Sequence, residues 1–249
     1  MNLTIKKIVQ LFAQKVMPKI AYPILIGPLK GIKFIHGALA GPSFGASVYI
    51  NRIEQKQTNE FVKQLKFGNI VFDIGANVGY YTLLASKLIG EKGKVFSFEP
   101  VVRNLVFVYD HVRINKLKNV IILPFACSEQ SKLEIFSFGP DCAQGHITKN
   151  VIASEINSDT HTFVNTIKVD EFVSKYKILP DIIKMDVEGA ELLVLKGAKE
   201  TLLKCKPKIF LSIHSAELEL SCKEYLKDFS YNFILLDEKE RPSVEYLCY

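Results

Sequence analysis

Residues able to bind a nucleoside-type ligand are concentrated in one short stretch of the chain, residues 71–81, which reads VFDIGANVGYY. An apolar run ends around Asp73, a glycine turn begins at Gly75, and helix-forming residues follow. A second apolar run ends at Glu99, about 24 residues after Gly75. A glycine turn that opens a helix lets backbone approach a ligand, and an acid ending the next strand can accept hydrogen bonds from both ribose hydroxyls. This layout predicts a nucleoside-binding α/β site.

The spacing of the glycines narrows the class of ligand. A dinucleotide site needs G-x-G-x-x-G, and counting from Gly75 the second and third places hold Asn77 and Tyr80. No G-x-x-x-x-G-K-[ST] string for a phosphate-binding loop occurs either. The pattern that remains is D-x-G-x-N-x-G, running from Asp73 to Gly79, and a polar Asn within it disfavours an NAD-linked oxidoreductase.

A second constellation of acids lies in residues 180–191, which read PDIIKMDVEGAE. Asp186 ends an apolar run, and Glu188 and Glu191 follow where a helix begins. An acid beside a reacting hydroxyl can orient or deprotonate it, but acids in a first helical turn also cap free N–H groups. His214 ends a later apolar run and is a second candidate base, with a purely structural role left open.

Four of these side chains end strands that the pattern predicts to be parallel. They are Asp73, Glu99, Asp186 and His214. Ligands of open α/β sheets bind at the carboxyl ends of the strands, so we expect all four to rim one crevice.

Three strings in order, DIGANVG, PDIIKMDVEGAE and VLKGA, resemble the FkbM-type methyltransferases over roughly residues 65–215. The resemblance implies a class I, Rossmann-like fold and S-adenosylmethionine as cofactor. It also implies which residues line the cofactor. The aminocarboxypropyl end would contact Asp73, Gly75, Asn77 and Gly79, the ribose Glu99, and the adenine the residues after the third strand, Ala126, Cys127 and Ser128. Asp186 would also bind the cofactor.

The same resemblance implies that Asp186 and Glu188 face a methyl acceptor, which would be a small molecule or a glycan. The expected reaction is in-line transfer of a methyl group to a hydroxyl of a sugar, glycolipid or secondary metabolite. The enzyme must then align the two reactants to roughly 3 Å and remove a proton. Tyr80 or Tyr81 could face the sulfonium. A non-catalytic methyltransferase-like binding module stays open as an alternative.

Strands and helices alternate along most of the chain, which predicts an α/β fold: a doubly wound, mostly parallel seven-stranded sheet with an antiparallel last strand. Residues 139–163 have no clear period and predict a long loop. Short extended pieces are expected at 46–50, 133–138 and 166–169. The predicted strands are 70–73, 94–98, 120–125, 182–185, 208–214, 232–237 and 244–247, and the predicted helices are 52–67, 80–89, 102–116, 170–176, 190–203 and 216–229.

The N-terminal fifth of the chain differs in charge from the rest. Residues 1–50 contain six lysines and no Asp, Glu or Arg, which equals the whole formal charge of +6. We therefore divide the chain into a basic helical or extended cap, 1–50, and a methyltransferase domain, 51–249. Apolar residues on one helical face of the first 20 residues predict either a helix packed on the body or a peripheral contact with an anionic membrane. Lysines without arginine or interleaved aromatic residues do not favour a nucleic-acid partner.

Scattered cysteines and histidines exclude other classes. The five cysteines form no C-x-x-C pair, which favours a reducing, cytoplasm-like compartment. No H-E-x-x-H occurs and the five histidines are dispersed, so the spacing predicts no metal site. Residues 41–45 match G-x-S-x-G, but an extended segment is expected after them instead of the helix that a nucleophile elbow needs.

Overall fold

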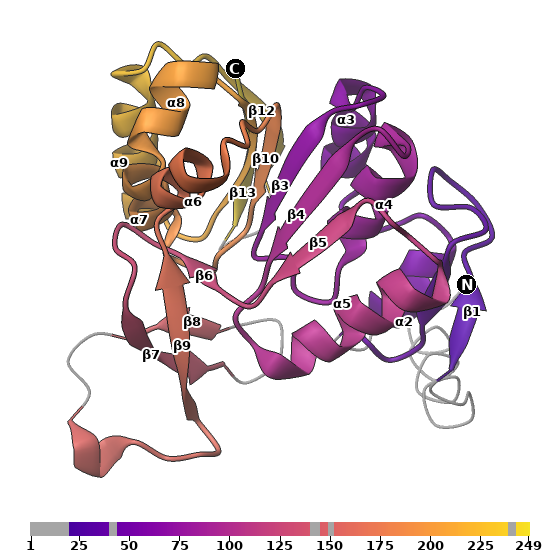
Figure 1. Ribbon diagram of the computed structural model, residues 1–249, viewed down its shortest axis with the longest axis horizontal. Coiled ribbons are helices and arrows are strands. Elements are labelled where there is room, and N and C mark those ends of the chain that lie inside the picture. The colour runs from indigo at the N-terminus through magenta and orange to yellow at the C-terminus, as the bar shows by residue number, and fades with distance from the viewer. Residues whose placement is uncertain (1–19, 40–43, 140–144, 149–151, 239–242) are drawn as a thin grey trace.

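The computed structural model describes residues 20–39, 44–139, 145–148, 152–238 and 243–249. Its centre is a seven-stranded sheet between two layers of helices (Figure 1), with strand order β12-β13-β11-β10-β3-β4-β5. Five neighbouring strands, β11, β10, β3, β4 and β5, are mutually parallel. β13 runs antiparallel to its two neighbours, β11 and β12. This confirms the predicted fold. The strands are β3 (Ile70–Ile74), β4 (Lys94–Phe98), β5 (Val120–Leu123), β10 (Ile182–Met185), β11 (Lys208–Ile213), β12 (Phe233–Glu238) and β13 (Val244–Cys248).

Helices cover both faces of this sheet, with α3, α4 and α5 on one side and α6 to α9 on the other (Figure 1). Successive residues of a strand point to opposite faces, so Val71 packs with α3 and α4 while Phe72 packs with α6 to α9, and both are fully buried. Burial on both faces explains why the central strands are continuous apolar runs. The helices are α3 (Gln55–Gln64), α4 (Tyr80–Ile89), α5 (Val102–Ile114), α6 (Val169–Tyr176), α7 (Glu191–Gly197), α8 (Lys199–Cys205) and α9 (Ala216–Lys227).

A second, smaller sheet projects from the body beside the carboxyl ends of the strands (Figure 1). Its order is β6-β9-β7-β8. The prediction of a long loop over 139–163 is wrong within the described residues, because β8, a 3₁₀ turn at Ala153–Glu155 and the start of β9 lie there. β8 pairs with β7, and β9 pairs with both β7 and β6, partners that local sequence does not reveal. The strands are β6 (Ala126–Cys127), β7 (Leu133–Phe138), β8 (Gly145–Ile147) and β9 (His161–Ile167).

The described part of the predicted cap consists of a hairpin, β1 (Ala21–Pro23) with β2 (Lys33–Ile35), and helix α2 (Phe44–Tyr49). The expected strand at 46–50 is wrong, because a short apolar run fits either a helix or a strand. Apolar residues of this segment share one core cluster with α3 and α4. The domain boundary at residue 50 stays a prediction, and the expected N-terminal helix lies outside the described residues.

The predicted helix 190–203 is two helices that meet at Ala198. Gly197, the last residue of α7, lies so close to the Ser128 carbonyl oxygen that a Cβ would stand 2.1 Å from it. The glycine of the VLKGA string is therefore explained by packing. The predicted helices 52–67 and 102–116 are shorter at their ends in the structure.

None of the helices in the described part of the chain is long and apolar enough to span a bilayer.

Candidate functional site

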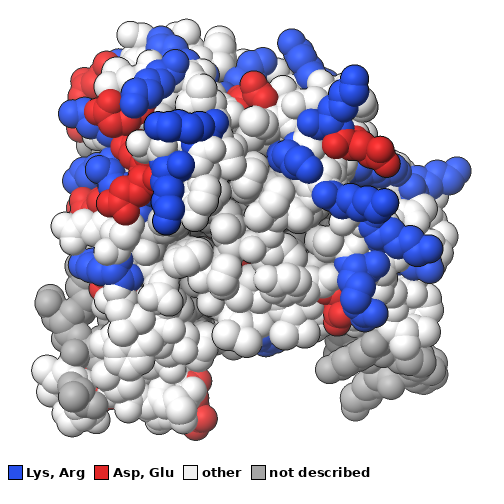
Figure 2. Space-filling view, viewed as in Figure 1, with Lys and Arg blue, Asp and Glu red and all other residues white. Residues whose placement is uncertain are grey.

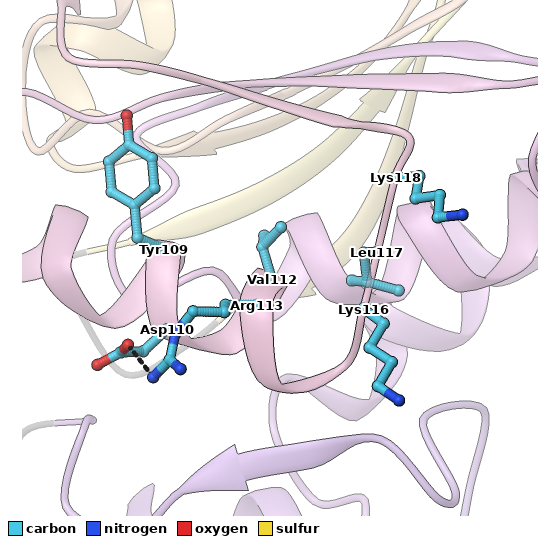
Figure 3. Close-up of a pocket in the computed structure, with 7 residues that line it drawn as sticks. All are labelled: Tyr109, Asp110, Val112, Arg113, Lys116, Leu117 and Lys118. Atoms are coloured by element: carbon cyan, nitrogen blue, oxygen red, sulfur yellow. Dashed lines mark hydrogen bonds and ion pairs between the residues drawn. The ribbon is translucent and has the colours of Figure 1, made fainter.

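A cavity of about 990 Å³ opens at the carboxyl ends of β3, β4, β10 and β11, where the small sheet forms one wall. A second hollow of about 500 Å³ lies along the C-terminal end of α5 (Figure 3). That hollow contains none of the predicted site residues, and its Arg113 is paired with Asp110 at 3.0 Å. The large cavity is therefore the candidate site.

The cavity brings together most of the residues that the sequence singles out. All four strand-end side chains line it, as the parallel topology requires, and so do both tyrosines at the start of α4. The predicted residues in its lining are Asp73, Gly75, Asn77, Tyr80, Tyr81, Glu99, Ala126, Cys127, Asp186, Glu188 and His214.

Two predicted cofactor residues are not in the lining of the cavity. Gly79 has a φ of 90° and directly precedes α4, and its N–H donates to the carbonyl of Ala76 at 2.8 Å. Ser128 is buried, and its N–H donates to the carbonyl of Ile167 at 3.1 Å, which joins β6 to the end of β9. The structure thus gives both residues a local structural role and removes them from the cavity wall.

The two principal motifs meet in space at Gly75. Its φ of 81° is a conformation that favours glycine, and a Cβ there would stand 1.8 Å from the carbonyl oxygen of Asp186. The N–H of Asp186 in turn donates to the carbonyl of Ile74 at 3.0 Å. This position must therefore be glycine because the second motif approaches it closely. The sequence alone suggests a different reason, the approach of a ligand.

Glu99 lies at the end of β4 and is only 4% exposed. One carboxylate oxygen accepts from the N–H of Asn77 at 2.7 Å, and the other accepts from the N–H of Val101 at 2.9 Å. Burial raises the pKa of Glu99 to about 7, although these hydrogen bonds favour its ionised form. The carboxylate is thus held rigidly at the cavity wall, with Asn77 in the left-handed region at φ 50°.

Asp73 is buried at the end of β3. Its carboxylate accepts from the hydroxyl of Thr82 on α4 at 2.5 Å. Burial raises the pKa of Asp73 to about 6, and the Thr82 hydrogen bond and the Lys184 charge oppose that rise. The hydrogen bond to α4 fixes the glycine turn between strand and helix.

Three carboxylates surround the half-buried ring of His214. Its Nδ1–H donates to Glu191 Oε1 at 2.7 Å, and its Nε2 lies 3.4 Å from both Asp186 and Glu188. Burial disfavours protonation, but the Glu191 hydrogen bond and the charges of Asp186 and Glu188 outweigh it and raise the pKa of His214 to about 9. At neutral pH both ring nitrogens are therefore protonated and the ring is cationic. The carboxylates are then the proton acceptors of this cluster.

Lys184 also lines the cavity, although its sequence position suggests no chemistry. It is 1% exposed, and its Nζ lies 2.9 Å from Ser212 Oγ, 3.5 Å from Asp186 and 5.0 Å from the centre of the Tyr81 ring. Burial lowers its pKa, but nearby carboxylates, Asp186 foremost, outweigh this and raise it above the ordinary value. The sequence signal for this residue is a lysine within an apolar strand. Such a lysine is expected to be buried, and a buried cation needs anionic partners.

The partners of Lys184 extend into a buried polar network. Ser212 donates to Glu245 at 2.6 Å, and Glu245 also accepts from Gln57. The hydroxyl of Tyr81 donates to Glu54 at 2.8 Å. The Tyr81 ring lies over the Lys184 ammonium and also lines the cavity, and its contact with a sulfonium stays a prediction.

The small sheet adds an apolar wall that the sequence analysis missed. Phe136 and Phe138 of β7, Ile147 of β8, and Thr162 and Phe163 of β9 all line the cavity. Figure 2 shows the Lys and Arg side chains gathered over the helical layers, with a largely uncharged surface between them. The cavity therefore has an acidic floor, formed by Asp186 and Glu188, and an aromatic side, formed by the phenylalanines of β7 and β9.

Comparisons with known proteins identify similar sequences and folds. Residues 73–235 match the model of the methyltransferase FkbM domain. A hexuronic acid methyltransferase, AglP of Haloferax volcanii, is 28% identical over 155 residues, which cover 61% of this chain and 59% of that protein. The chain thus spans less than two thirds of that relative.

Solved structures show the same fold at low identity. The methyltransferase FkbM of Methylobacillus flagellatus KT superposes with a TM-score of 0.56 at 19% identity, over 85% of this chain and 56% of that one. A precorrin-6y C5,15-methyltransferase of Geobacter metallireducens GS-15 gives 0.50 at 15% identity, over 78% and 87%.

The seven-stranded sheet with its antiparallel β13 has the class I methyltransferase fold. The chain belongs to the FkbM methyltransferase family, since the family model matches more than half of it. This confirms the family resemblance seen in the three sequence strings, and it agrees with S-adenosylmethionine as the cofactor expected from them.

Proposed function

We propose that this protein is an S-adenosylmethionine-dependent O-methyltransferase that acts on a hydroxyl of a sugar, glycolipid or secondary metabolite. The observation that carries the proposal is Glu99: a buried carboxylate, held by two backbone N–H groups, that faces a strand-end cavity. Membership of a methyltransferase family supports the same reaction class.

The residues of the cavity fit the proposed cofactor. Glu99 is fixed by its backbone donors and faces the cavity, so it would accept hydrogen bonds from ribose hydroxyls. Asp73, Gly75 and Asn77 would hold the amino-acid end, and Ala126 and Cys127 would lie beside the base. The volume of about 990 Å³ is at the upper end of the range for ligand pockets. When bound, the cofactor supplies an electrophilic methyl group.

The acceptor would enter between the acidic floor and the small sheet. Asp186 and Glu188 would orient the attacking hydroxyl and take its proton, because the pKa of about 9 leaves His214 protonated at neutral pH. Phe136, Phe138 and Phe163 would pack against the apolar face of the acceptor. The similarity to a hexuronic acid methyltransferase makes uronic-acid glycans the first acceptors to test.

The cofactor class can be tested by calorimetric titration of the purified protein with S-adenosylhomocysteine and, separately, with NAD. We expect binding of the first and none of the second. Glu99→Ala should weaken the binding at least about tenfold, roughly 1.4 kcal/mol, through loss of a charge-assisted hydrogen bond. Glu91→Ala, which removes an exposed acid, is the matched control. Binding of NAD alone would favour the oxidoreductase, and binding of neither would favour the binding module.

A second proposal concerns the predicted contact with an anionic membrane through residues 1–20. In the described residues beside that segment, the side chains of Ile20, Leu25 and Ile26 are 53%, 62% and 53% exposed. Aliphatic side chains beside a lysine-rich, acid-free segment suit an anionic bilayer surface. Deletion of residues 1–20 should reduce sedimentation with anionic vesicles and leave that with neutral vesicles unchanged. Equal binding of both proteins to anionic vesicles would refute the contact.

A further inference from the structure

Three side chains on the floor of the cavity present their donor atoms to one point. Asp186 follows β10, Glu188 comes two residues later, and His214 follows β11. One ligand atom from each lies within 4.8 Å of the other two. His214 Nε2 is 3.4 Å from Asp186 Oδ1 and 3.4 Å from Glu188 Oε2. All three residues are half-buried and line the cavity.

The two separations of 3.4 Å from His214 Nε2 suit a shared metal ion. Donor atoms bound to one ion at about 2.1 Å lie roughly 3.0 to 3.4 Å apart in octahedral or tetrahedral geometry. The set contains two carboxylates and one imidazole, which is a donor set for a divalent cation such as Mg²⁺ or Mn²⁺. Three protein ligands on one side leave positions open toward the cavity, as catalytic metal sites do.

A residue outside the ligand set orients the imidazole. Glu191 of α7 is 0% exposed, and its Oε1 accepts from His214 Nδ1–H at 2.7 Å. The N–H of Gly189 donates to the same carboxylate at 3.0 Å. A buried carboxylate on one ring nitrogen fixes the tautomer and aims the other nitrogen at a metal, an arrangement that metal-binding histidines commonly show. This distinguishes the cluster from a patch of surface acids.

We propose that Asp186, Glu188 and His214 bind one divalent cation, which holds the hydroxyl of the methyl acceptor. The inference rests on the proposed function. A cation would bind the neutral imidazole through Nε2 and lower the pKa of a bound hydroxyl, and the non-ligating oxygen of Asp186 or Glu188 would take the proton and pass it to solvent. With more than one open position, the site selects acceptors that offer two adjacent oxygens. The substrate class is thus a vicinal diol or a hydroxy acid, both of which a uronic acid contains.

The sequence predicts no metal site, because it contains no short metal-binding motif such as H-E-x-x-H or a C-x-x-C pair. Here the donors come from the ends of two different strands, β10 and β11, which are neighbours in the sheet. Only the parallel pairing of these strands brings Asp186 and Glu188 to His214.

The test is a titration of the chelator-treated full chain with Mn²⁺, in which free Mn²⁺ is followed by electron paramagnetic resonance. We expect one saturable site, and at least about tenfold weaker affinity in Glu188→Gln and in His214→Asn, since each removes one of three ligands. Glu217→Gln, on the exposed surface of α9, is the matched control and should bind as the wild type does. Calorimetry with S-adenosylhomocysteine on each variant checks that the cavity is folded.

Two results would overturn the metal site. One is no saturable Mn²⁺ binding in wild-type protein that binds S-adenosylhomocysteine, which leaves the proposed function intact. The other is unchanged Mn²⁺ affinity in both ligand variants, which puts the ion elsewhere. Saturable Mn²⁺ binding that both variants weaken, in a protein that fails to bind S-adenosylhomocysteine, would instead keep the metal site and remove the proposed cofactor.

Discussion

Two histidines in different regions of this molecule show how surroundings decide what the same side chain does. His111 lies where the N-terminal hairpin meets α5, and His214 lies on the cavity floor. The ring of His111 is fully buried: its Nδ1–H donates to the carbonyl of Val78 at 2.8 Å, and its Nε2 accepts from the N–H of Ile35 at 2.9 Å. Because one ring nitrogen donates to a carbonyl and the other accepts from an N–H, the ring must be neutral.

The pKa values of the two rings move in opposite directions. Burial lowers the pKa of His111 to about 4. At His214, burial is outweighed by the carboxylates of Glu191, Asp186 and Glu188, and the pKa rises to about 9. The neutral ring of His111 hydrogen-bonds two segments of the chain to each other. The ring of His214 lies within a charged cluster that lines the cavity. Stability should therefore depend on the first ring and chemistry on the second.

Removal of the first ring should have the largest effect. His111→Ala loses the stacking of the ring on Phe34, at 4.1 Å between centroids, and leaves two backbone groups without partners. We expect a loss of about 3 kcal/mol in the free energy of unfolding, measured with urea. His146→Ala, at an exposed position of β8, is the control and should change little. A loss below about 1 kcal/mol would contradict the connecting role.

The second region should respond in turnover instead. Glu188→Gln keeps the shape of the side chain and removes its charge beside His214. We expect turnover at least about 100-fold lower, equivalent to roughly 2.7 kcal/mol, because a positioned base contributes that much or more. The measurement is the rate of S-adenosylhomocysteine formation with a uronic-acid glycan, with Glu217→Gln as control. Full activity of Glu188→Gln would move the base to Asp186.

The pH dependence of stability sharpens the contrast further. Between pH 7 and pH 5 an unfolded histidine, with its ordinary pKa near 6.5, gains a proton, while folded His111 stays neutral. Unfolding then takes up protons, so stability falls as the pH falls, by about 2 kcal/mol from this group.

The variant His111→Gln isolates this contribution, because Asp73, Glu99 and His214 titrate in both proteins. Urea unfolding at the two pH values should show the advantage of the wild type over the variant shrinking by about 2 kcal/mol at pH 5. If the stability difference between wild type and variant is equal at both pH values, the prediction is wrong. Asp110, a charged neighbour that raises the pKa of His111, would then keep the ring protonated.

The smallest expected effect concerns another attachment of the hairpin. The hydroxyl of Tyr49 donates to the carbonyl of Phe34 at 2.9 Å. Tyr49→Phe should cost about 1 kcal/mol of unfolding free energy, the usual net contribution of one hydrogen bond. Tyr109→Phe, at a site that is 54% exposed, is the comparison. Equal stability of the two variants would show that the apolar contacts alone hold the hairpin.

Much of the sheet could be predicted because its strands are buried on both faces. The apolar runs at 94–98 and 182–185 mark β4 and β10 at their observed bounds, and helix α4 likewise begins at Tyr80 and ends at Ile89. The strand-end residues Glu99 and His214 reach one cavity because the carboxyl ends of parallel strands share one edge of a sheet. Periodicity and topology rules suffice for these features.

Other features escaped prediction because they depend on partners distant in sequence. The strands β8 and β9 exist through pairing with β7. The buried ammonium of Lys184 is stabilised by Ser212 and Asp186, which follow it at unequal distances along the chain. The segment 46–50 was assigned to a strand although α2 forms there, since five residues hold too little pattern to decide.

The sequence by itself determined the fold class, the family and the strand-end residues that share one cavity, because each follows from local motifs and from the alternation of apolar strands with helices. Tertiary structure decided why Gly75 must be glycine, which carboxylates surround His214, and what lines the acceptor side. These depend on distances between segments, and the free energies of burial, charge pairing and metal binding are set by those distances.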